Sequence, residues 1–95
     1  MSPEYSAAKA ALIRLTATLA PLSQSHGVRV NCVVPDWVAT ERGVRERAAL
    51  PVAERGPELV SLEVLTDAVV RFVEDETLAG RVVLLDRGAE PRFLE

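Results

Sequence analysis

The sequence predicts an α/β fold built from two parallel strands and about three helices. Two short runs rich in β-branched residues, at 28–34 and 81–86, are bounded by glycine or proline and have the length of strands. Apolar residues recur at helical spacing over 3–22 and 62–74, and a weaker helical stretch covers 41–50. A strand–helix–strand connection makes the two strands parallel neighbours, so the helix at 62–74 should pack on them.

The first helix is expected to start after Ser2, whose hydroxyl can cap it, with Pro3 in a favourable first-turn position. Pro21 should kink the last turn or end the regular helix, and Gly27 should stop it. The apolar stripe of this helix consists of Tyr5, Ala8, Leu12, Leu15, Leu19 and Leu22.

The run at 28–34 has the pattern of a strand that is buried on both faces, as in a parallel sheet. Cys32 is then expected to be a small core residue. A turn is expected next, over Pro35, Asp36 and Trp37. They lie at the carboxyl end of the strand, which is where open α/β sheets bind ligands.

The second half of the chain adds one short helix, one clear helix and one strand. Thr40 can cap the short helix at 41–50, which Gly43 weakens, and a loop is expected over 51–57. The strand at 81–86 follows the helix at 62–74. The tail at 89–95 has no clear pattern, and we expect it to be frayed.

Size and composition indicate one small globular domain of 95 residues, with 48% apolar and 26% charged residues. No apolar run could span a bilayer and no secretory signal is visible, so no membrane association is expected. The single cysteine can form neither an internal disulfide nor a metal cluster, which favours a reducing, cytoplasmic setting. The net charge of −3 argues against nucleic acid as a partner.

Tyr5 and Lys9 are four residues apart, so they share one face of the first helix. An ammonium beside a phenol stabilises the phenolate, which makes tyrosine useful as a proton donor or acceptor. The alternative is an ordinary amphipathic helix surface, where this spacing often arises by chance.

Four segments, in the same order along the chain, resemble the C-terminal part of a short-chain dehydrogenase/reductase. Tyr5 and Lys9 match the Tyr-x-x-x-Lys pattern of that family. The segments that follow resemble the strand leading to the nicotinamide end of the cofactor, the cofactor-contacting stretch after it, and the last strand. The four segments are 5–9, 28–35, 37–40 and 80–88.

This resemblance implies an NAD- or NADP-dependent oxidoreductase that moves hydride between the nicotinamide and a small alcohol or carbonyl substrate. Tyr5 would be the general acid/base, and Lys9 would assist it and bind the nicotinamide ribose. The backbone of Val38 would hold the carboxamide. Thr40 would hydrogen-bond the carboxamide or a phosphate, the alternative being a plain helix cap. The implied cofactor-binding residues are Tyr5, Lys9, Pro35, Asp36, Val38 and Thr40.

The chain also departs from the family pattern. It contains no glycine-rich phosphate loop and no serine in the position that the family uses upstream of Tyr5. Asp36 stands where the family usually has glycine, so its carboxylate should point away from a bound pyrophosphate. The stretch at 86–88 keeps one glycine of the usual pair.

These matches and departures predict that residues 1–95 are a C-terminal fragment of an NAD(P)-binding, Rossmann-like domain with a doubly wound parallel sheet. We expect a truncated chain that is inactive alone and forms homo-oligomers. The alternative is a non-catalytic interaction or oligomerisation module, because the tyrosine-bearing helix packs against a partner subunit in the family. Uncovered strand edges should leave the isolated chain marginally folded or self-associating.

Overall fold

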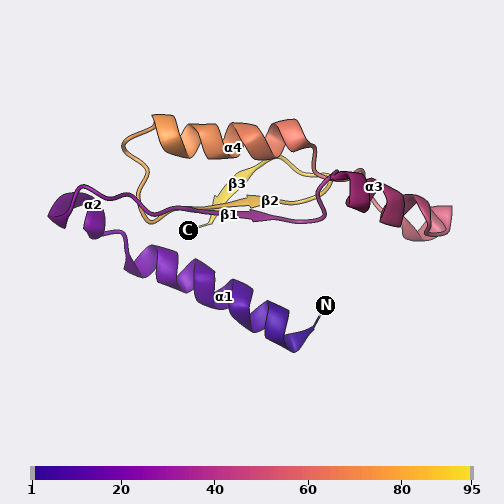
Figure 1. Ribbon diagram of the computed structural model, residues 1–95, viewed down its shortest axis with the longest axis horizontal. Coiled ribbons are helices and arrows are strands. Elements are labelled where there is room, and N and C mark those ends of the chain that lie inside the picture. Colours follow the sequence, from indigo (N-terminus) through magenta and orange to yellow (C-terminus); the bar gives the residue numbers. More distant parts are fainter. Residues whose placement is uncertain (1, 95) are drawn as a thin grey trace.

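One three-stranded sheet lies between two helices in the computed structural model, which describes residues 2–94 (Figure 1). The elements are α1 (Pro3–Thr18), α2 (Leu22–Ser25), β1 (Cys32–Pro35), α3 (Glu41–Ala48), the 3-10 helix η1 (Val52–Glu54), α4 (Leu62–Glu74), β2 (Val82–Leu85) and β3 (Arg92–Leu94). The helix α4 covers one face of the sheet, α1 lies along the other, and α3 projects beyond the end of the sheet. The predicted α/β class is confirmed, with a third strand and a fourth helix in addition to those predicted.

The strands β1 and β2 are parallel neighbours, as predicted. Cys32 pairs with Val82 at one end of the ladder and Pro35 pairs with Leu85 at the other. The helix α4 packs on both strands. The carboxyl ends of β1 and β2 therefore meet at one end of the sheet, which is the end from which α3 projects (Figure 1).

The first helix ends earlier than the predicted boundary at residue 22. The regular helix α1 stops at Thr18, and Pro21 begins the single turn of α2 in a helical conformation. Gly27 follows with a φ of 66°, a left-handed conformation that suits glycine at the end of a helix. The predicted effect of Pro21 and the predicted stop at Gly27 are thus confirmed.

The first strand is shorter than predicted, because it begins at Cys32 and not at residue 28. Before it, one backbone bond of 2.8 Å joins the Gly80 N–H to the Val30 carbonyl, and side chains supply further bonds. The Arg29 guanidinium donates four hydrogen bonds to backbone carbonyls at and beyond the end of α4, the shortest of them to Phe72 at 2.7 Å. The Asn31 side chain accepts a bond of 2.9 Å from the Arg81 N–H. These two polar side chains fasten the turn before β2 to the segment before β1.

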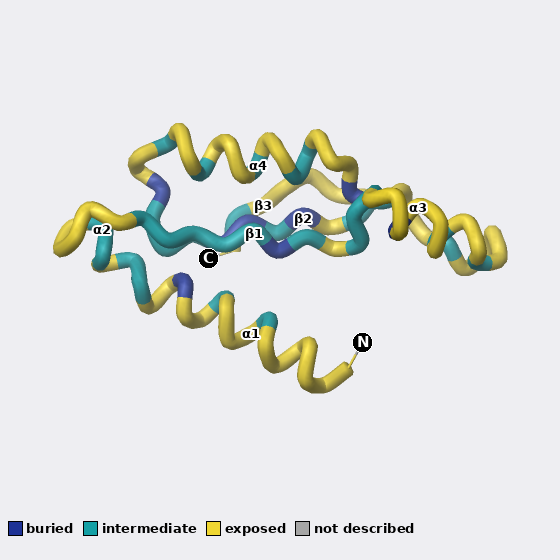
Figure 2. The backbone as a smooth tube through the Cα atoms, in the orientation of Figure 1, coloured by how far each residue is buried: buried dark blue, intermediate teal, exposed yellow. Residues whose placement is uncertain are grey.

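The prediction that this strand is buried on both faces is wrong. Val34 is the buried residue of β1, whereas Cys32 is half-buried and so is not a core residue. The helix α1 does not close the face of the sheet opposite α4. Thr16 is the buried residue of α1, whereas Leu12 and Leu15 are 58% and 52% exposed. Figure 2 shows this helix as mostly exposed along its length.

The core lies between α4 and the sheet. Its buried residues are Val60, Val83 and Leu85, of which Leu85 is 1% exposed. Residues packed against them come from β1, the loop after it, α4 and the tail: Val33, Val38, Val64, Leu65, Ala68, Phe72 and Phe93. Ser61 caps α4, its hydroxyl accepting a 3.1 Å bond from the Val64 N–H. The predicted helix at 62–74 therefore matches the observed one at both ends.

The tail is not frayed over its described part, contrary to prediction. Residues 92–94 form β3, which pairs antiparallel with β2, while Glu95 lies outside the described residues. The contacts of the Phe93 side chain explain why the tail is ordered. Its ring meets Phe72 edge-to-face with centroids 6.1 Å apart. The guanidinium groups of Arg71 and Arg81 also lie over it, at 4.8 and 4.4 Å.

The molecule is elongated, with extents of 51 × 29 × 21 Å and a radius of gyration of 15.3 Å. A compact domain of this length would have a radius of gyration of about 12.4 Å. The difference reflects the projecting α3 and the loosely packed α1. No helix among residues 2–94 is both long and apolar enough to cross a membrane.

Candidate active site

Tyr5 and Lys9 lie on one face of α1, as the spacing predicts. Ser2 caps the helix by accepting a 3.1 Å bond from the Tyr5 N–H, which fixes the turn that carries the phenol. The Lys9 ammonium nitrogen is 5.4 Å from the centroid of the Tyr5 ring, within the range of a cation–π contact. Tyr5 is 52% exposed, so the pair is accessible to a ligand.

The second part of the site is the loop after β1. Its backbone is held to two other segments: the Asp36 N–H donates to Leu85 at 2.9 Å, and the Ala39 N–H donates to Val60 at 2.8 Å. Val60 in turn donates to the Trp37 carbonyl at 2.9 Å, which makes a parallel bridge centred on Val38. In such a bridge the N–H and C=O of the central residue face away from the partner strand. The amide of Val38 is therefore turned away from Val60.

The carboxylate of Asp36 is occupied by backbone amides. One oxygen accepts a 2.8 Å bond from the Trp37 N–H, and the other accepts a 3.4 Å bond from the Arg87 N–H. This side chain therefore ties the loop after β1 to the residue that follows β2. That the carboxylate points away from a bound pyrophosphate stays a prediction.

Thr40 begins α3 as a helix cap. Its hydroxyl oxygen accepts a 3.0 Å bond from the Gly43 N–H, and its own N–H donates to the Val38 carbonyl at 2.8 Å. Because a hydroxyl carries one donor as well as its acceptor sites, the cap leaves that proton free for a ligand. The plain cap is observed, and a ligand-binding role remains compatible with it.

Gly43 is a site residue whose role sequence reasoning missed. It is buried in the first turn of α3, where a Cβ would lie 2.3 Å from the Val38 carbonyl oxygen. Glycine therefore lets α3 approach the loop more closely than any other residue would. The sequence indicated a weak helix at this position, and the tertiary contact supplies the reason for the glycine.

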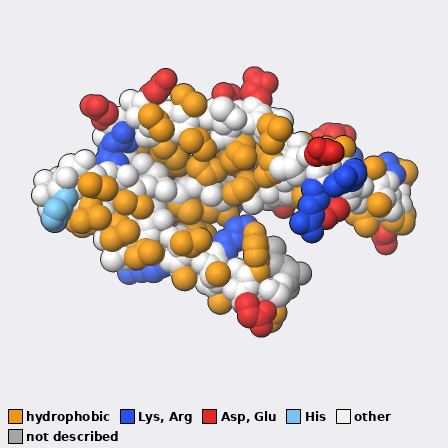
Figure 3. All heavy atoms as spheres, in the orientation of Figure 1, with side chains coloured by type: hydrophobic (Ala, Val, Ile, Leu, Met, Phe, Trp, Pro, Cys, Tyr) orange, Lys and Arg blue, Asp and Glu red, His pale blue; other side chains and the backbone are white. Residues whose placement is uncertain are grey.

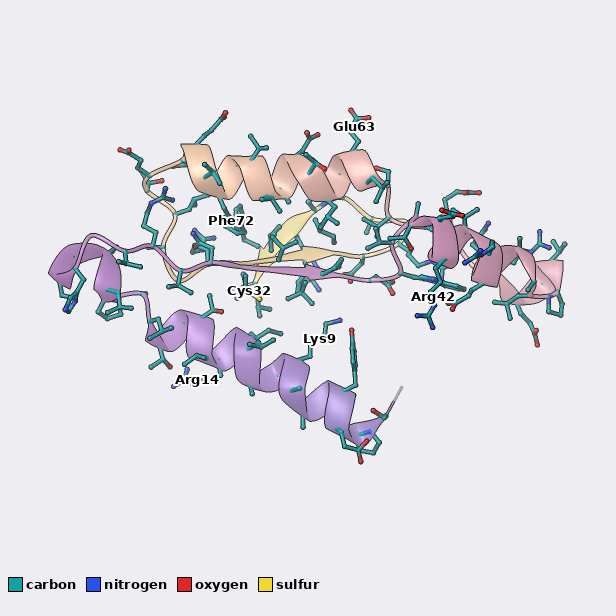
Figure 4. The ribbon with its side chains drawn as sticks, viewed as in Figure 1. Lys9, Arg14, Cys32, Arg42, Glu63 and Phe72 are labelled. Atoms are coloured by element: carbon teal, nitrogen blue, oxygen red, sulfur yellow. The ribbon has the colours of Figure 1, made fainter. Side chains whose placement is uncertain are left out.

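All six predicted site residues line one open groove of about 930 Å³ between the start of α1 and the start of α3. Its lining residues are Ser2, Tyr5, Lys9, Pro35, Asp36, Trp37, Val38, Thr40, Arg42 and Glu46. The space-filling view shows the notch, with basic side chains on both of its walls (Figure 3). In Figure 4, Lys9 points from α1 toward the sheet, and Arg42 extends from α3 on the side of the sheet where α1 lies.

Two lining residues carry charges that the sequence did not single out. Arg42 and Glu46 are an exposed pair with 2.7 Å between Nε and Oε1. This hydrogen bond, together with the negative charge of Glu46, raises the pKa of Arg42 above its ordinary value. The pair adds one fixed positive and one fixed negative charge to the rim of the groove.

A smaller cavity of about 240 Å³ continues from the groove beneath β1. Tyr5 and Lys9 line both spaces, and Cys32 lines the smaller one. Figure 4 shows Cys32 directed from β1 toward α1. Among residues 2–94, no group of three or more His, Cys, Asp or Glu side chains is placed to hold a metal ion.

Comparisons with known proteins point to one family. A family model for short chain dehydrogenases matches residues 1–50. A short-chain dehydrogenase from Aspergillus ruber is 53% identical over 86 residues, covering 90% of this chain and 26% of that protein. Carbonyl reductase family member 4 from Danio rerio is 33% identical over 88 residues, covering 90% of this chain and 37% of the relative.

A (+)-borneol dehydrogenase from Salvia officinalis is also 33% identical, over 105 residues that cover 88% of this chain and 36% of that enzyme. The chain thus spans between about a quarter and two fifths of the length of these relatives. No solved structure gives a significant match. Since the family model covers more than half of the 95 residues, the chain belongs to the short-chain dehydrogenase family.

Proposed function

We propose that this chain is the C-terminal part of an NAD(P)-dependent oxidoreductase acting on a small alcohol or carbonyl compound. One observation carries the proposal. A helix and a loop about thirty residues apart in the sequence bring Tyr5, Lys9, Val38 and Thr40 to the same groove. The printed names of two relatives, a carbonyl reductase and a borneol dehydrogenase, support the substrate class.

The proton chemistry rests on Tyr5. Its hydroxyl donates a proton to a carbonyl oxygen during reduction, or accepts one from an alcohol during oxidation. The Lys9 ammonium lies 5.4 Å from the centroid of the Tyr5 ring, and both side chains line the same groove. Tyr5 is exposed, Lys9 is half-buried and both line the open groove, so a substrate can reach them.

The groove offers a set of groups that suits a nicotinamide nucleotide. Val38 has its amide turned away from Val60, and Thr40 has a free hydroxyl proton. Asp36 would repel a phosphate, but both of its oxygens already accept backbone N–H groups. When bound, the nicotinamide would supply or accept the hydride. The lining residues give no preference between NAD and NADP.

Residues 1–95 lack a glycine-rich turn that would bind the pyrophosphate at a helix N-terminus. We therefore propose that this chain alone is inactive, and that activity requires the remainder of such a domain. A cytoplasmic location remains part of the proposal, as does assembly into homo-oligomers.

A second function, a non-catalytic oligomerisation module, is favoured by exposed apolar side chains of α1. Leu12, which lines the cavity beneath β1, and Leu15 are each more than half exposed. Apolar side chains gathered on one helix face are typical of a surface that a partner covers. Both functions can use the same chain, because the exposed face lies on the helix that carries Tyr5.

A chimera separates the two functions. In the Aspergillus ruber relative, the segment that this chain matches is replaced by this chain, and turnover of ketones and secondary alcohols is measured with NAD(H) and NADP(H). We expect activity that Tyr5→Phe lowers by about 10²–10⁴-fold, because only the proton-carrying hydroxyl is lost, while cofactor affinity changes little.

Lys9→Ala should weaken both cofactor binding and turnover, since one ammonium serves two tasks. Arg14→Ala is the matched control, because Arg14 is a basic residue of the same helix that lines a different cavity. A chimera that folds and binds cofactor, yet turns over equally well with Tyr5→Phe, would reject the catalytic proposal and leave the oligomerisation module.

A further inference from the structure

Arg87, the second residue after β2, makes contacts that no predicted role explains. Its guanidinium donates to the backbone carbonyls of Arg55 and Pro57 through one nitrogen, and Nε donates to Pro57 again at 3.2 Å. Arg87 is half-buried; its bond to Arg55 is partly shielded from water, whereas its bonds to Pro57 are exposed. The side chain thereby fastens the stretch after η1 to the end of the sheet.

The same residue also holds the loop that lines the groove. The Arg87 guanidinium carbon is 5.2 Å from the centroid of the Trp37 ring. The Arg87 N–H donates to one oxygen of Asp36, whose other oxygen accepts the Trp37 N–H. One side of the guanidinium therefore faces the site loop while its N–H groups bind the 55–57 segment.

The segment from α3 to residue 57 otherwise bonds largely to itself. Arg55 donates to the carbonyls of Leu50 and Ala48 at 3.0 Å, and Arg47 donates to Gly56 at 3.1 Å. This segment projects from the sheet (Figure 1). A planar guanidinium can stack on an aromatic ring while its edge binds carbonyls, which an ammonium cannot do. Arg87 is thus a clamp between the projecting segment and the site loop.

We propose that Arg87 is a positioning residue of the candidate site: by clamping residues 55–57 against Trp37, it fixes the backbone of Val38 in the groove. Its effect on the cofactor rests on the proposed function, in which Val38 binds the nicotinamide. The clamp itself is independent of that function. The two can therefore fail separately.

Trp37 is the single tryptophan of the chain, so its fluorescence reports on the clamp directly. In Arg87→Ala we expect stronger quenching by acrylamide, and in Arg87→Lys a similar increase, because the ammonium keeps the charge without the planar fork. Arg71→Ala is the matched control, since its guanidinium lies 4.8 Å from the Phe93 ring, outside the groove lining. Unchanged Trp37 quenching in Arg87→Ala, with helix content retained, would overturn the clamp.

Trypsin gives a second test, on the chain and on the chimera. The Arg55 carbonyl that Arg87 binds belongs to the Arg55–Gly56 peptide bond, which trypsin can cleave. We expect cleavage there to rise about tenfold in Arg87→Ala, relative to cleavage after Arg45, because cleavage follows the population of the opened segment. Equal cleavage ratios in both proteins would contradict the clamp.

Steady-state kinetics of the chimera test the positioning role. Arg87→Ala should raise the KM for cofactor about tenfold, which corresponds to about 1.4 kcal/mol, with kcat within about twofold. A merely structural role would reduce the amount of active enzyme and leave KM unchanged. Changed Trp37 quenching combined with an unchanged KM would leave the clamp but overturn positioning. A chimera that is inactive before any substitution would reject the proposed function, while quenching and trypsin would still decide the clamp.

Discussion

Replacing Gly43 with alanine has two effects of opposite sign on the free energy of unfolding. Helix propensity alone favours alanine by about 1 kcal/mol. The structure opposes it, because the new Cβ would lie 2.3 Å from the Val38 carbonyl oxygen and 3.2 Å from both Thr40 Oγ1 and Trp37 Nε1. The loop would have to retreat by about 1.1 Å to reach an ordinary contact of 3.4 Å.

Overpacking of this kind costs about 1–3 kcal/mol, and a loosened Thr40 cap adds about 1 kcal/mol. We therefore expect Gly43→Ala to lower the free energy of unfolding by about 1–3 kcal/mol after the gain in propensity is subtracted. Urea unfolding followed by circular dichroism measures it. Arg45→Ala, an exposed change on the same helix, should stay within about 0.5 kcal/mol. A Gly43→Ala protein that is more stable by about 1 kcal/mol would refute the close contact.

Three further changes test the fold. Arg29→Met removes four hydrogen bonds to carbonyls at and beyond the end of α4 and should cost about 3 kcal/mol in urea unfolding. Gly80→Ala should cost a similar amount, about 3 kcal/mol, because the φ of 69° strains alanine and the new Cβ would lie 2.4 Å from that of Ala20. Hydrogen bonds from the side chain and backbone of Thr77 lower the pKa of Asp75 below 3.8. The ionised Asp75 carboxylate therefore stabilises the fold at pH values above its ordinary pKa, and this stabilisation is lost as the pH falls through the lowered pKa. Thr77→Val should raise the Asp75 pKa in an NMR titration and reduce the stability that is lost on acidification.

The sequence predicted an element correctly where residues within that element, or next to it, determine its ends. The helix at 62–74 carries its own cap at Ser61 and its own apolar stripe, so both ends were predictable. The start of β1 was not, because Arg29 and Asn31 bond to residues more than forty positions away. The short β3 depends on contacts of Phe93 with Phe72 and Arg71 of α4 and with Arg81, the residue before β2, which no three-residue pattern indicates.

The residues of the candidate site also fall into those that local sequence predicts and those that depend on tertiary contacts. The spacing of Tyr5 and Lys9 and the turn after β1 are local features, and the fold brings them to one groove. Gly43 and Arg87 act through contacts with Val38, Trp37 and Pro57, which only the tertiary structure reveals. Such residues are hidden in a single sequence because glycine and arginine are common in helices and turns for other reasons.

Isotope transfer in the chimera tests the central proposal most directly. NADH or NADPH with both C4 hydrogens of the nicotinamide replaced by deuterium is supplied with a ketone, and the alcohol product is examined by mass spectrometry and NMR. The proposal predicts one deuterium on the carbinol carbon, formed at a rate that Tyr5→Phe lowers by at least about a hundredfold. Product without deuterium, or transfer that proceeds at the same rate with Tyr5→Phe, would contradict it.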